Sequence, residues 1–317
     1  MNFKINYFSL FLFFIGSFYS CKPAVDDTIV DDDKNTPIKI IDCSSIEEDE
    51  APNYDCVLDN HAAETQYDDI FHTLLLALTQ VEDSTKARNF SARGVLHPAD
   101  CWSSLEYDTI NKTIIVHYDS AYCQEDEQLR MGEINVSYTG YIKEVGTVIV
   151  GTPVAFYVGG NLKRKKIDGV ITITNMGLNS AGKYVYEYKV KDGKVAFDDD
   201  GTISWETTRY WVWEKGEETK KNYWDDVFTV YGSAKGVTRS GKNFEVICDK
   251  DTPQYYDSKS NCFYLFNSKM AIRGILNFKL DNEPDLTLDY GSQADSCDRK
   301  VSVSRCNGHT HDLTIIQ

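Results

Sequence analysis

The sequence predicts a mainly β protein: a large antiparallel meander sheet, either an open half-barrel or a sandwich, with one N-terminal amphipathic helix covering a face. Three observations support this fold class. Segments of strand character follow one another from residue 112 to the end of the chain. Turn sequences rich in Gly, Asn and Asp separate them, which favours antiparallel hairpins. No helical pattern of about 12 residues lies between them, so folds built from parallel βαβ units are excluded.

The first element in chain order is an export signal at residues 1–20. Lys4 precedes an apolar run over about residues 5–19, and Ser20 stands directly before Cys21. The run is too short to cross a membrane as a helix. A small residue followed by Cys at the end of such a run resembles the lipobox of bacterial lipoproteins, in which the Cys becomes the N-terminus and carries fatty-acyl chains such as palmitate. We therefore expect lipidation at Cys21; an ordinary cleavable signal is the alternative.

Residues 21–58 read as an acidic, flexible tether. Between residues 22 and 69 there are fifteen acidic and three basic residues, which account for most of the net charge of −16. Acidic residues soon after the acylated Cys, here Asp26, Asp27 and residues 31–33, resemble the surface-export signal of Bacteroidota lipoproteins. This predicts an outer-membrane lipoprotein facing the cell exterior, with a plain charged spacer as the alternative. The negative charge argues against a nucleic-acid partner, and none is expected.

Residues 59–100 form the predicted helical segment that packs on the sheet, with a helix over about residues 60–81. Its apolar residues recur at spacings of three and four, which is typical of one buried helix face. Asp59 or Asn60 is expected to cap the helix, and Glu64, Asp68 and Asp69 to complement its dipole. The apolar stripe comprises Tyr67, Ile70, Phe71, Leu74, Leu75, Leu78 and Val81.

Residues 101–317 form the predicted antiparallel β-domain. The expected strands are 112–118, 133–141, 147–158, 166–175, 184–190, 202–213, 227–238, 244–248, 271–280, 286–290, 300–303 and 310–315. Hairpin turns are expected at Gly159-Gly160-Asn161, Asp192-Gly193, Asp200-Gly201, Ser240-Gly241 and Asn307-Gly308, because Gly and Asn tolerate the positive φ that tight turns demand.

Nine cysteines are present, and lipidation of Cys21 leaves an even number, as an oxidising compartment favours. None has the spacing of a zinc site, so disulfides are favoured over metal binding. Eight cysteines allow 105 pairings, among which the sequence alone does not choose. The working set is Cys43–Cys56, Cys101–Cys123, Cys262–Cys297 and Cys248–Cys306.

Several motifs together resemble a family of uncharacterised Bacteroidota surface lipoproteins of unknown function. They include Lys112-Thr-Ile-Ile-Val-His-Tyr-Asp-Ser-Ala-Tyr-Cys123, Phe156-Tyr-Val-Gly-Gly-Asn161, Gly201-Thr-Ile-Ser-Trp-Glu-Thr-Thr-Arg209 and Leu286-Thr-Leu-Asp-Tyr-Gly291. The resemblance spans about residues 101–317 and supports Cys101–Cys123 and Cys262–Cys297 as pairs. It implies a location and a fold but no activity.

The strand at 202–213 carries the most prominent candidate binding face. Strand alternation places Trp205, Arg209, Trp211 and Trp213 on one side. A row of Trp with an Arg is a possible platform for sugar rings or other flat ligands, whereas the favoured interpretation is that these side chains fill the core between sheet and helix.

Other candidate sites are weak. His309 and His311 share a strand face without a third metal ligand, and Asp198-Asp-Asp200-Gly201 reads better as a hairpin turn than as a calcium site. No nucleophile–base motif, phosphate loop or dinucleotide fingerprint is present. The sequence therefore predicts no catalytic residues, no metal and no cofactor, and it favours a non-enzymatic role without deciding the question.

Three functions follow. The preferred one is a surface-displayed binding or interaction lipoprotein, held at the membrane by its N-terminal lipid, with a glycan, protein or amphiphile as ligand. The first alternative is an envelope carrier that encloses an amphiphile between a curved sheet and a helix lid. The second is a secreted hydrolase with a carboxylate or metal site, since the spacing of carboxylates in space is not visible in the sequence.

Overall fold

The computed structural model divides the chain into two compact units, residues 1–37 and 38–317. It describes residues 54–85, 93–96, 103–122, 128–160, 163–219, 225–258, 270–291 and 300–315, all of which belong to the second unit. The predicted export signal, Cys21 and most of the predicted tether lie outside the described residues.

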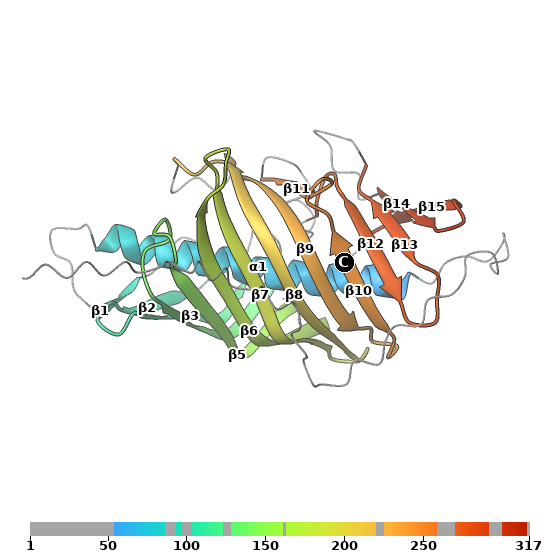
Figure 1. The fold of residues 1–317 in the computed structure, drawn as a ribbon. Helices are drawn as coiled ribbons and strands as arrows, with labels where there is room; N and C mark the ends of the chain where they lie inside the picture. The colour runs from blue at the N-terminus through green and yellow to red at the C-terminus, as the bar shows by residue number, and fades with distance from the viewer. Residues whose placement is uncertain are drawn as a thin grey trace, which may run out of the picture. The chain divides into compact units, whose positions relative to one another are not determined.

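The strands form one antiparallel sheet that is not closed (Figure 1). Fourteen strands follow the path β1 to β10 and then β12 to β15, while β11 pairs with β9. This confirms the predicted meander in its open form. The strands are β1 (Arg93–Leu96), β2 (Ser104–Asp108), β3 (Thr113–Tyr122), β4 (Leu129–Tyr138), β5 (Val148–Gly160), β6 (Lys163–Leu178), β7 (Tyr184–Phe197), β8 (Thr202–Lys215), β9 (Val227–Val237), β10 (Asn243–Cys248), β11 (Gln254–Asp257), β12 (Ile275–Leu280), β13 (Leu286–Asp289), β14 (Lys300–Arg305) and β15 (Thr310–Thr314).

The single helix of the described residues, α1 (Asp55–Ser84), crosses one face of the sheet (Figure 1). The whole predicted apolar stripe is buried. Helix α1 begins a turn earlier than predicted, after Tyr54, and no side chain caps it, so the expected capping by Asp59 or Asn60 is wrong. Most of its polar side chains are buried as well, because the sheet curves around the helix instead of covering one side only.

Hairpin turns join the strands largely where the sequence predicts them. Gly201, Gly241 and Gly308 have positive φ in the links β7–β8, β9–β10 and β14–β15. The pair Asp192-Gly193 is a correction, because it lies inside β7 as a β-bulge and not at a turn. A side chain at Gly193 would meet the hydroxyl of Tyr67, which donates to the carbonyl oxygens of Asp168 (2.6 Å) and Lys194 (3.3 Å). The bulge, with Gly193 at this position, therefore leaves room for Tyr67 of α1 to reach the sheet.

Three short strands, β1, β2 and β11, were not expected. Each has only four or five residues, too few for an alternation pattern to stand out. Strand β1 also lies within residues 59–100, the predicted helical segment. The helix ends at Ser84, so this predicted boundary is wrong.

The disulfide predictions are partly wrong. Cys56 and Cys248 are buried free thiols, so the pairs Cys43–Cys56 and Cys248–Cys306 do not form. Cys306 is disulfide-bonded. Cys56 lies on α1 and Cys248 at the end of β10, where each packs in the hydrophobic core as a small apolar side chain. The remaining cysteines lie outside the described residues, so the other pairs stay predictions.

Candidate functional site

The predicted aromatic face of β8 lies in the interior and packs against α1. Trp205 and Trp211 are fully buried, and Arg209 is 1% exposed. Trp205 stacks on Tyr67 with 5.3 Å between ring centroids, and Trp211 stacks on Phe71 at 4.4 Å. The core interpretation is confirmed for Trp205, Arg209 and Trp211, which are not available as an exposed ligand platform.

Trp213, the last residue of that face, is only partly buried and belongs to a different environment. Its indole N–H donates to Asp226 Oδ1 at 3.1 Å. Burial raises the pKa of the Asp226 carboxyl to about 7, although the bond from Trp213 opposes the shift, and the nearby charges of Asp225 and Glu217 add to it. Asp226 is therefore an acid that titrates near neutral pH.

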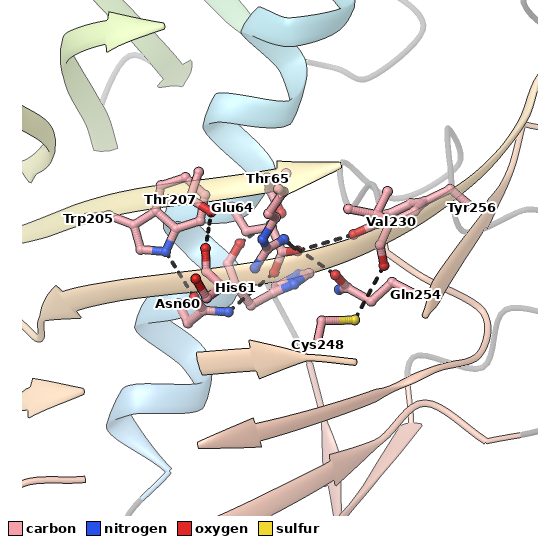
Figure 2. A network of polar contacts seen from close by, with 12 residues as sticks. Asn60, His61, Glu64, Thr65, Trp205, Thr207, Val230, Cys248, Gln254 and Tyr256 are labelled. Carbon is pink, nitrogen blue, oxygen red and sulfur yellow. Dashed lines mark hydrogen bonds and ion pairs between the residues drawn. The ribbon is translucent and has the colours of Figure 1, made fainter. Parts of the chain in front are cut away.

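A buried polar network centred on Arg209 joins α1 to the sheet. Figure 2 shows Glu64 of this network on α1, with Gln254 and Tyr256 on β11. Glu64 Oε1 forms an ion pair with Arg209 Nη1, and both side chains are at most 2% exposed. The Tyr256 hydroxyl donates to the same Glu64 oxygen at 3.3 Å. Gln254 Oε1 accepts from Arg209 Nη1 at 3.3 Å. Helix α1, β8 and β11 thus converge on one buried charge pair.

The network continues toward the N-terminus of the helix through Asn60 and Asp59. Asn60 accepts from the indole N–H of Trp205 at 2.9 Å and donates to Glu64 Oε2 at 3.2 Å. Asp59 accepts from Arg239 Nε at 2.7 Å and from the Arg239 backbone N–H at 2.8 Å. Arg239 also pairs with Asp200, so the predicted turn at residues 198–201 is held next to the start of α1.

Electrostatic effects hold the titratable side chains of this interior in unreactive protonation states. Burial lowers the pKa of Arg209, but the charges of Glu64 and Asp68 outweigh burial and raise it, so the guanidinium stays charged. Burial lowers the pKa of His61 to about 4 and raises the pKa of Cys248 to about 11. At neutral pH the imidazole and the thiol are both uncharged, so Cys248 is not an activated nucleophile.

The other candidate residues lie on the surface. His309 is exposed before β15, and His311 is half-buried on that strand. Within the described ranges, no group of three or more His, Cys, Asp or Glu side chains is arranged to hold a metal ion.

A second feature, which we call the apolar end, consists of Ile110, Tyr141, Val145, Met176 and Leu178. These large side chains are 52–68% exposed. Val145 lies near the backbone of β6, since a side chain added at Gly177 would sit 3.4 Å from both methyl groups of Val145.

Backbone contacts bring the segments of the apolar end together. The Gly146 N–H donates to the Asn175 carbonyl at 2.8 Å, and the Tyr138 N–H donates to the Lys112 carbonyl at 3.1 Å. Three parts of the chain therefore meet at one end of the sheet, namely the β2–β3 link, the β4–β5 link and the end of β6. The end of α1 lies there too, because Glu82 Oε1 accepts from the Ile142 N–H.

Sequence reasoning missed both features. The signal for the network was a second stripe, Asn60, Glu64 and Asp68, polar at a spacing of four, together with an Arg at a core position of β8. The apolar end had no comparable signal. Its residues come from two links and the end of one strand, which are distant in sequence and are brought together only by the fold.

Among the described residues, no helix is long and apolar enough to cross a membrane. No protein-family model matches the chain, and no match was found among curated proteins or solved structures.

Proposed function

We propose that this protein is a lipid-anchored envelope protein, displayed on the cell exterior, that binds a partner protein through the apolar end. The observation that carries the proposal is the concentration of five exposed large apolar side chains at one end of the sheet. Exposed large apolar side chains gathered at one part of a protein are typical of interaction sites. The anchoring part rests on the lipobox-like sequence at Ser20-Cys21.

The position of the apolar end suits a protein anchored at its N-terminus. The tether joins α1 at Asp55, beside the Arg239 turn, whereas the apolar end lies beside Glu82 at the other end of the helix. A helix of 30 residues is about 45 Å long. Most of the length of α1 therefore separates the apolar end from Asp55, where the tether joins the helix.

A protein partner fits the surroundings of the apolar end better than a lipid surface does. Among the described residues, Lys112, Lys143 and Lys183 are accompanied there by Asp108, Glu144 and Glu217, three basic residues against three acidic ones. Anionic membranes attract clusters of basic residues, and this mixture lacks the required excess of positive charge. Apolar side chains with mixed charges around them match the core and rim of a protein interface.

The carrier alternative places an amphiphile between sheet and helix. In the described residues, that space is lined by side chains of α1 and of the sheet that pack on each other, such as Phe71, Trp211 and Tyr188. The surface of the apolar end has no such covering, which is why we prefer a binding role there.

The anchor is tested by replacing Cys21. Cys21→Ala should abolish incorporation of labelled palmitate and release the protein from the membrane fraction, whereas Cys56→Ala, which changes a buried thiol, should not affect labelling. Protease added to intact cells should remove the wild-type domain. Labelling that persists in Cys21→Ala, or a domain cleaved only after lysis, would contradict the anchor or the surface location respectively.

The binding site is tested by a photo-cross-linking residue at position 176 in intact cells. We expect adducts with one discrete envelope protein, abolished by Val145→Asp and retained in Val154→Asp, which changes an exposed valine of β5 outside the apolar end. Adducts that are insensitive to Val145→Asp, or that contain only lipid, would overturn the partner-binding proposal. Surface immunostaining of each variant shows that display is unchanged.

A further inference from the structure

Arg209 uses only one side of its guanidinium in the network. Nη1 carries the bonds to Glu64 and Gln254. Nε and Nη2 are buried and find no hydrogen-bond partner among the described residues. These two N–H groups form the fork with which Arg donates two parallel hydrogen bonds.

The Tyr188 hydroxyl is a second polar group in the same situation. Tyr188 on β7 is the cross-strand partner of Arg209 on β8, and its ring is fully buried. Its oxygen also has no hydrogen-bond partner among the described residues. The large majority of buried side-chain polar atoms in proteins have a hydrogen-bond partner, and leaving one unsatisfied is costly, so three such groups on one cross-strand pair indicate a ligand.

The charges around the fork select the kind of ligand. Glu64 and Asp68 contribute two carboxylates against one guanidinium, and both act electrostatically on Arg209. The two carboxylates would repel a further anion, and the positively charged N–H groups of Arg209 would repel a cation. A small neutral molecule that both accepts and donates hydrogen bonds fits both constraints, and water is such a molecule.

We propose that the interior between α1 and the β7–β8 pair holds a buried water site, in which a water molecule accepts hydrogen bonds from Arg209 Nε and Nη2 and donates one to the Tyr188 hydroxyl oxygen. The water extends the direct network that fixes α1 on the sheet. It also makes this part of the interior polar and hydrated, so it is unsuited to an acyl chain. The site is independent of the proposed partner binding at the apolar end.

A high-resolution crystal structure of the purified full-length protein tests the proposal. We expect ordered water at about 2.7–3.2 Å from Arg209 Nε and Nη2. Tyr188→Phe should displace or disorder the water near position 188 and lower Tm by only a few degrees. The matched control is Tyr256→Phe, which removes a hydroxyl that bonds directly to Glu64 and should leave the water in place.

Three outcomes would overturn the proposal. The first is direct contact of Arg209 Nε and Nη2 with a protein carboxylate and no water density. The second is density for an apolar ligand beside these N–H groups. The third is identical water positions in wild type and Tyr188→Phe. Magnetisation transfer from water to the labelled Arg209 side-chain N–H groups in NMR spectra gives a second measurement that does not depend on crystals. Its absence under conditions where other buried N–H groups are observed counts against the site.

Discussion

The two ends of α1 show opposite distributions of polarity. Near its N-terminal half, Glu64, Asn60 and Arg209 form an ion pair and amide contacts that are completely buried. Near its C-terminus, the apolar end exposes side chains such as Val145 and Leu178 to solvent. Globular proteins ordinarily bury apolar groups and expose charges, so each region departs from the usual pattern in the opposite direction.

The difference indicates different roles for the two regions. A buried ion pair adds little net stability, but removing one partner is very costly, so the pair penalises any other placement of the helix. The polar network thus specifies where α1 sits. Exposed apolar side chains contribute little to the stability of the isolated fold, so the apolar end is compatible with the binding role proposed for it.

The largest expected effect is that of Arg209→Met. The substitution leaves the Glu64 carboxylate buried without its counter-charge, and we expect the free energy of unfolding to fall by about 3–5 kcal/mol. Urea denaturation of the full-length protein measures this loss. The double variant Glu64→Gln with Arg209→Met should recover part of the stability, because no charge is then left unpaired. A loss below about 1 kcal/mol for Arg209→Met would contradict a buried charge pair.

The next effect separates hydrogen bonding from packing within the aromatic face. Trp205→Phe leaves the Asn60 oxygen without its indole donor, and we expect a loss of about 2 kcal/mol in unfolding free energy. Trp211→Phe is the matched control, since the indole N–H of Trp211 bonds to none of the described residues. Equal losses in the two variants would show that side-chain volume, and not the Asn60 bond, sets the cost.

The sequence predicts the parts of this fold that depend on local chemistry. Alternation along 202–213 places Trp205 and Arg209 correctly on one face, and Asp200-Gly201 correctly marks a turn. Asp192-Gly193 has the same local chemistry yet forms a bulge, because Tyr67 from the helix packs against Gly193 and the strand continues past it. The curvature of the sheet determines which residues far apart in the sequence face each other, such as Glu64 and Arg209, which are 145 positions apart. No local pattern encodes it.

The third prediction concerns pH and the carboxyl of Asp226. The pKa of this carboxyl is raised to about 7 in the folded protein from an ordinary value of 3.8. The folded state therefore retains a proton that the unfolded state has released, and the free energy of unfolding falls as pH rises from about 4 to about 7.

Asp226→Asn should remove this contribution while keeping an acceptor for the Trp213 indole. The difference in unfolding free energy between Asp226→Asn and wild type should grow with pH and level off above about pH 7. Denaturation curves at several pH values measure it. A difference that does not change between pH 4.5 and 7.5 would show that Asp226 titrates normally.

The smallest expected effect belongs to the apolar end. Val145→Ser should change the free energy of unfolding by no more than about 0.5 kcal/mol, because the side chain is 67% exposed and loses little burial on substitution. Val158→Ser in β5 is the control, since this valine is 2% exposed and its replacement should cost about 2 kcal/mol or more. If Val145→Ser were as destabilising as Val158→Ser, Val145 would belong to the hydrophobic core and could not be the surface that a partner covers. If stability is unchanged and adducts at position 176 are nevertheless lost, the apolar side chain serves an interaction and not the fold.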